Sequence, residues 1–121
     1  MKWVVVITLV CISSWGSLAS AGEADVIAVE KKMEGGRIYQ FAVTVRHADT
    51  GWDHYADKWE VVDEKGAVLG TRVLLHPHVD EQPFTRSLLG VKIPAGVKKI
   101  TVRAHDSVHA YGGKEITLEL P

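Results

Sequence analysis

Apolar and polar residues alternate along most of the chain, and short turns rich in Gly, Pro and Asp separate the alternating segments. In the clearest segment, residues 37–47, Tyr39, Phe41, Val43 and Val45 fall on one face and mostly polar residues fall on the other. A period of two is typical of a β-strand that buries one face. The same pattern predicts seven strands, at residues 25–32, 37–47, 55–63, 68–75, 84–93, 99–104 and 115–120.

These strands predict an all-β fold, because no segment of useful length has helical periodicity. Trp59 shares a face with Val61 in the third strand and is therefore predicted to be buried. The sequence ITVRAHDS at residues 100–107, the glycine pair at 112–113 and ITL at 116–118 resemble the last hairpin of bacterial immunoglobulin-like and fibronectin-type domains. That resemblance implies a seven-stranded antiparallel immunoglobulin-like sandwich.

The first residues have the pattern of a targeting segment. Lys2 precedes an apolar run over residues 3–12, and an A-x-A cleavage signal ends at Ala21. The apolar run is shorter than the roughly 20 residues that span a bilayer. We therefore expect a cleavable signal peptide at residues 1–21, a mature domain at residues 22–121, and a periplasmic or secreted location.

Composition narrows the possible chemistry. The only cysteine, Cys11, lies within the predicted signal peptide, so the mature chain has no thiolate for a blue-copper or iron–sulfur site. The formal net charge is −1 and no basic patch is present, so nucleic acid is not an expected partner. The sequence also has no basic amphipathic helix, so no membrane contact is expected after signal cleavage.

A second resemblance concerns residues 43–88, which include HADTGWDHYADKWE and LLHPHVDEQPFTRS. This stretch is similar to short exported bacterial proteins of uncharacterised function. The resemblance implies a location in the bacterial envelope and implies no activity.

All six histidines fall where strands are predicted to end, in three turn regions. Immunoglobulin topology brings these three connections to one end of a sandwich, whereas the turns around Gly35, Gly66 and Gly96 lie at the other end and contain no histidine. Imidazole suits borderline metal ions. We therefore predict that one zinc or copper(II) ion binds through some of the histidines, which are His47, His54, His76, His78, His105 and His109.

Strand parity limits how many histidines can converge. His47 and Asp106 are predicted to point inward and His105 outward, so three or four ligands are expected. The spacing of His76 and His78 suits a shared ion in any tertiary arrangement. Five aspartates flank the same loops: Asp49, Asp53, Asp57, Asp80 and Asp106. Each can be a metal ligand, an acceptor that orients an imidazole, or simply a turn residue. Because His47 is predicted to point inward, it has an alternative role as a hydrogen-bonded histidine at the edge of the core.

Two other functions compete with metal binding. The same loops can form a protein-interaction surface of the bacterial envelope, with Trp52 and Tyr111 as the expected contacts and Tyr55 and Phe84 beside them. A three-histidine site with an open position can also activate water. We do not expect an enzyme, however, because the chain has no nucleophile-elbow motif and little mass with which to build a substrate pocket.

Overall fold

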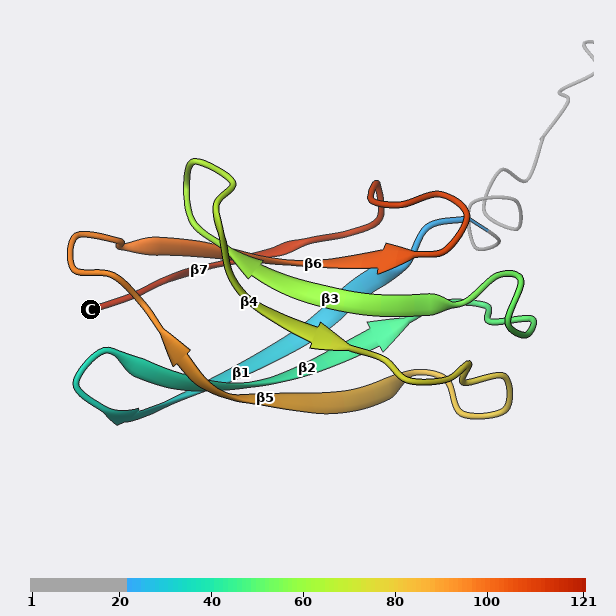
Figure 1. The fold of residues 1–121 in the computed structure, drawn as a ribbon, viewed down its shortest axis with the longest axis horizontal. Coiled ribbons are helices and arrows are strands. Elements are labelled where there is room, and N and C mark those ends of the chain that lie inside the picture. The colour runs from blue at the N-terminus through green and yellow to red at the C-terminus, as the bar shows by residue number, and fades with distance from the viewer. Residues whose placement is uncertain (1–21) are drawn as a thin grey trace, which may run out of the picture.

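The computed structural model describes residues 22–121, which form seven antiparallel strands in two facing sheets (Figure 1). The predicted signal peptide lies outside the described residues. The strands are β1 (Asp25–Gly35), β2 (Ile38–Arg46), β3 (Ala56–Val62), β4 (Val68–Val73), β5 (Phe84–Lys92), β6 (Lys99–Asp106) and β7 (Ile116–Glu119). The predicted number of strands is confirmed, and each strand lies within three residues of its predicted bounds.

The two sheets share the strands unequally. One has the order β1-β2-β5, and the other has the order β4-β3-β6-β7. In the first, Val43 of β2 pairs with Val29 of β1 and with Arg86 of β5. In the second, Trp59 of β3 pairs with Arg72 of β4 and Ala104 of β6, so Trp59 belongs to a central strand of this sheet.

The core lies between the sheets and consists of the inward residues that the alternation predicts. Phe41, Val43, Trp59, Val61 and Val102 are fully inaccessible to solvent. The predicted burial of Trp59 is thus confirmed. Removing such apolar surface from water contributes roughly 1.5–3 kcal/mol for each large side chain, and this contribution holds the sheets together.

The strand connections divide between two ends of the sandwich (Figure 1). The β2–β3, β4–β5 and β6–β7 connections, residues 47–55, 74–83 and 107–115, lie at what we call the loop end. The other three connections lie at the opposite end. The three histidine-bearing regions therefore share one end, as the sequence predicts. None of the described residues forms a helix of the length and hydropathy needed to cross a membrane.

Candidate metal centre

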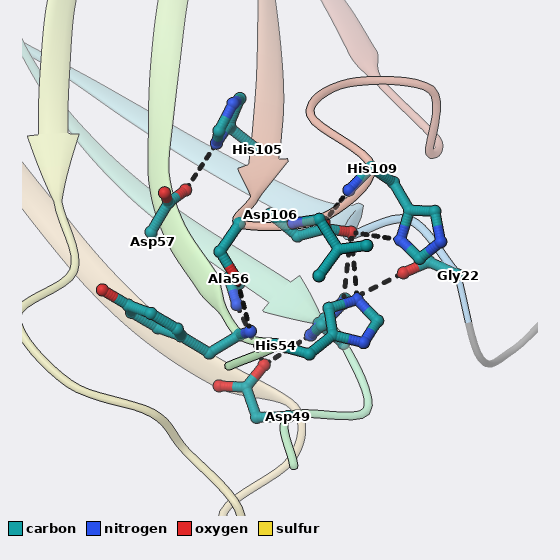
Figure 2. Close-up of polar contacts among 12 residues, drawn as sticks. Gly22, Asp49, His54, Ala56, Asp57, His105, Asp106 and His109 are labelled. Atoms are coloured by element: carbon teal, nitrogen blue, oxygen red, sulfur yellow. Dashed lines mark hydrogen bonds and ion pairs between the residues drawn. The ribbon is translucent and has the colours of Figure 1, made fainter. Parts of the chain in front are cut away.

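Three side chains converge at the loop end, two from the β2–β3 connection and one from the end of β6. His47 follows β2, His54 lies in the β2–β3 connection, and Asp106 is the last residue of β6. One ligand atom from each lies within 4.8 Å of the other two. We call these three residues the triad. Figure 2 shows His54 and Asp106 pointing toward the same small volume.

The triad has the spacing of ligands around one ion. His47 Nε2 lies 3.2 Å from His54 Nε2 and 3.3 Å from Asp106 Oδ2, and His54 Nε2 lies 3.6 Å from Asp106 Oδ2. A tetrahedral zinc ion with bonds of about 2.0–2.2 Å separates its ligand atoms by roughly 3.3–3.6 Å. The three observed distances lie close to this range.

Asp49 fixes the orientation and the tautomer of His47. The Asp49 Oδ1 atom lies 2.5 Å from His47 Nδ1, and both side chains are buried. An ionised carboxylate only accepts hydrogen bonds, so the imidazole proton of His47 is on Nδ1. In neutral His47 the lone pair is then on Nε2, the atom that faces the triad. Metal-binding histidines are commonly held by a carboxylate in this way.

The Asp49 carboxylate also joins separate segments of the loop end. The backbone N–H of Ala56 donates to Oδ1 at 3.0 Å, and the backbone N–H of His78 donates to Oδ2 at 2.7 Å. The side chain that orients His47 therefore also fixes the start of β3 and the β4–β5 connection.

Asp106 is fully buried and supplies the negative charge of the triad. Burial acts to raise the pKa of its carboxyl, but hydrogen bonds from the backbone of His109 and Val108 and from the His109 side chain outweigh it, with help from His47. The pKa therefore lies below the ordinary value of 3.8. Because Oδ1 accepts the two backbone N–H groups, Oδ2 remains free to face the histidines.

A backbone oxygen completes the surroundings of His47. Gly22 O lies 3.0 Å from His47 Nε2. The Nε2 atom thus faces a carbonyl oxygen, a carboxylate oxygen and a second imidazole nitrogen. A hydrogen on Nε2 would serve one of these neighbours at a time, whereas a cation among them contacts all four atoms together.

The remaining histidines lie beside the triad or away from it. The His109 ring centroid is 4.9 Å from that of His54, and its Nδ1 is 3.2 Å from Asp106 Oδ2. His105 points outward as predicted, and its Nδ1 lies 2.5 Å from Asp57 Oδ1 (Figure 2).

His76 and His78 lie in the β4–β5 connection with ring centroids 4.6 Å apart. His76 is exposed, whereas His78 is buried and stacks on Phe84 at 3.9 Å. Burial lowers the pKa of His78, and the Arg86 guanidinium, 3.0 Å from its Nε2, lowers it further. In this arrangement Nε2 of His78 is occupied by Arg86, and neither histidine belongs to the triad.

The two predicted partner-binding residues differ in accessibility. Trp52 is 67 % exposed, as predicted for a surface aromatic, and packs edge-on against Tyr55 with ring centroids 5.6 Å apart. Tyr111 instead lies half-buried on the outer face of the sheet, where its hydroxyl donates to Glu60 and its ring stacks with Arg103. Burial and the Glu60 carboxylate both raise the pKa of Tyr111.

The sequence pattern offered His47 and His54 among six candidate histidines and predicted the inward orientation of Asp106, which is fully buried. It assigned Asp49 and Asp106 to a group of aspartates without separating the orienting residue from the ligand. It did not identify Gly22, because a backbone carbonyl has no signature in the sequence.

Comparison with known proteins adds one relative and two structural neighbours. No family model matches the chain. The chain is 43 % identical over 97 residues to the protein named "Putative lipoprotein" of Halomicrobium mukohataei, an alignment that covers 80 % of this chain. The chain spans about half the length of that relative, namely 47 %.

The two solved structures each have a TM-score of 0.51 with this chain. One is a hypothetical protein of Pyrococcus horikoshii OT3, with 16 % identity over 84 % of this chain and 92 % of that one. The other is a superoxide reductase in the oxidised state, with 14 % identity over 84 % of this chain and 90 % of that one. At these identities the likeness shows a shared β-rich fold and nothing about chemistry.

Proposed function

We propose that this protein binds one zinc or copper(II) ion at the triad of His47, His54 and Asp106. The observation that carries the proposal is the set of ligand-atom distances, 3.2, 3.3 and 3.6 Å, around one shared volume. The proposed role is carriage, buffering or metal-dependent docking, and no catalytic step is part of it.

The type of ligand supports these two metals. Two imidazole nitrogens and one carboxylate oxygen are borderline to hard ligands, which suit zinc and copper(II) better than copper(I). Soft ligation has little support, because Met33, the only methionine after residue 1, lies on β1 and Cys11 precedes the described domain.

We also propose that the protein is exported and that its sandwich is immunoglobulin-like. The lipoprotein name of the Halomicrobium relative supports a location in the cell envelope. The sheet orders β1-β2-β5 and β4-β3-β6-β7, with three connections at each end, support the fold type. Cleavage of residues 1–21 is part of the same proposal.

Calorimetric titration of zinc and of copper(II) into residues 22–121 tests the metal proposal. We expect one ion per chain and a rise in thermal stability, worth about 2.7 kcal/mol at one hundred times the dissociation constant. Binding requires neutral imidazoles, so the affinity should fall as the solution is made acidic. Neither heat nor a thermal shift with either metal would refute the proposal.

Two matched variants localise the ion. The side chains of His54 and His105 have similar exposure, 20 % and 22 %, and both lie near the loop end. His54→Ala should weaken binding by at least about tenfold, whereas His105→Ala should not change it. A His76→Ala/His78→Ala double variant tests the pair that the sequence favours. A larger loss in the double variant than in His54→Ala would move the site to the β4–β5 connection.

One observation favours a second candidate function, a protein-interaction module of the envelope. Large apolar side chains are exposed on all three connections of the loop end: Trp52, Leu75, Val79 and Val108. Apolar residues gathered around one end are typical of a docking surface. If metal titration fails, a pull-down from envelope extracts that Trp52→Ala abolishes would support this module.

A further inference from the structure

The first described residues are held firmly against the loop end. Ala24 is 1 % exposed, and the backbone N–H of Val26 donates to Lys114 O at 2.8 Å. A Cβ atom at position 113 would lie 2.0 Å from Ala24 O, so only glycine permits this approach. The backbone N–H of Lys114 also donates to Asp25 Oδ1 at 2.7 Å.

This attachment fixes the position of Gly22, two residues before Ala24. Gly22 O lies 3.0 Å from His47 Nε2, at the edge of the triad. The nitrogen of Gly22 is two bonds from the carbonyl carbon of the same residue. An ion that binds both the nitrogen and the oxygen of Gly22 closes a five-membered chelate ring.

The chemistry of this nitrogen depends on whether the chain continues before it. In an intact chain the nitrogen belongs to a peptide bond, whose lone pair is delocalised and is not available to a metal while the nitrogen keeps its proton. After cleavage behind Ala21, the nitrogen is a free α-amine with an available lone pair. Because the amine is then part of the folded protein, it reaches the ion at a high effective concentration.

We propose that the α-amine and carbonyl oxygen of Gly22 complete the coordination of the ion, so that cleavage after Ala21 finishes the metal site. This inference rests on the metal site proposed above and on the predicted cleavage. It adds the first residue of the mature chain to the ligands of the triad. High-affinity metal binding is then a property of the mature protein alone.

Three forms of the same protein test the inference. The first begins at Gly22 with a free amine, the second is identical but acetylated at Gly22, and the third begins at Ala21. The third form keeps a terminal positive charge but places the Gly22 nitrogen in a peptide bond, so it separates charge from coordination. We expect the first form to bind copper(II) and zinc at least about tenfold more tightly than the other two.

A spectroscopic measurement identifies the nitrogen directly. With ¹⁵N-labelled glycine, the copper(II) electron paramagnetic resonance spectrum of the free-amine form should show altered nitrogen coupling, and that of the acetylated form should not. Intact-mass analysis of exported protein should in addition give a chain that begins at Gly22.

The outcomes separate this inference from the metal proposal. Equal affinities in the three forms, each lowered by His54→Ala, would retain the triad and overturn the role of Gly22. Absence of binding in all three would overturn both proposals. An exported protein whose mass includes residues 1–21 would overturn the coupling to cleavage.

Discussion

The two ends of the sandwich satisfy their polar groups in different ways. At the opposite end, two charged side chains form hydrogen bonds with the backbone of the turns. Arg37 donates to Ile93 O and Val97 O at 2.9 Å each. Asp63 accepts from the backbone N–H groups of Lys65 and Ala67, also at 2.9 Å each. At the loop end, histidines and aspartates are packed together below the surface.

This difference indicates which end is built for function. Every contact of Arg37 and Asp63 joins a donor to an acceptor, so these turns need nothing further. At the loop end, His47 Nε2 faces Gly22 O and Asp106 Oδ2, which are both acceptors. Of these two, Asp106 Oδ2 also accepts from His109 Nδ1 at 3.2 Å. A cation between the two acceptors would lower the free-energy cost of burying them so close together. The predictions below test the comparison from the largest expected effect to the smallest.

The core between the two ends should dominate stability. Trp59→Ala should lower the free energy of unfolding by about 3–5 kcal/mol, because Trp59 is fully buried in the core. Trp52→Ala, at the exposed loop surface, should change it by no more than about 0.5 kcal/mol. Denaturant unfolding of both variants provides the measurement. Similar losses in the two would contradict the assigned burial, as would equal quenching of both tryptophans by acrylamide.

A pair of aspartates compares the ends directly. Asp49→Ala removes a buried acceptor of two backbone N–H groups and leaves them without water, so we expect a loss of about 3 kcal/mol. Asp63→Ala also removes an acceptor of two backbone N–H groups, but these become hydrated, and a loss of about 1 kcal/mol is expected.

Metal binding makes the aspartate comparison sharper. Asp49→Asn keeps the shape of the side chain but weakens its hold on the His47 tautomer, so it should reduce metal affinity by about 10–100-fold. Asp63→Asn should not affect binding. If the two asparagine variants bind metal equally well, Asp49 has only a structural role.

The strands were predictable because burial imposes a period of two, and β2 shows this most directly. Tyr39, Phe41, Val43 and Val45 are all buried, as their alternation requires. The predicted bounds are less accurate at Gly35, Val73 and Asp106, where β1 ends three residues later, β4 two residues earlier and β6 two residues later than predicted. Strand ends depend on hydrogen bonding to neighbouring strands, and the alternation of apolar and polar residues does not predict which strands are neighbours.

The candidate site was predictable only in outline. Placing the histidines at one end required the strand count, and inward parity correctly separated His47 and Asp106 from His105. Nothing local distinguishes His54, which joins the triad, from His78, whose ring stacks on Phe84 and accepts from Arg86. That choice depends on tertiary packing. The same holds for Gly22, which Gly113 and Ala24 bring to the site.

The smallest predicted effect concerns the pH dependence of stability and the buried His78. Burial, Arg86 and His76 lower the pKa of His78 from 6.5, and Asp49 and Glu81 only partly oppose them. The unfolded chain therefore takes up a proton near pH 6.5, and the folded protein takes it up only at a lower pH. Neutral His78 thus contributes stability that is fully present above pH 6.5 and decreases as pH falls toward its folded pKa.

The expected loss in wild type is at most about 1.4 kcal/mol for each pH unit below 6.5, because one proton is involved. His78→Gln removes this group, so its stability should depend less on pH between 6.5 and 5. Asp106 does not interfere, because its pKa lies below 3.8 and its contribution is lost at more acidic pH. Metal-free protein, unfolded by denaturant at several pH values, gives both slopes, and nuclear magnetic resonance titration of His78 gives its pKa. A pKa above 6.5, or equal slopes in the two proteins, would show that the contact between His78 and Arg86 does not hold this imidazole neutral in the folded loop end.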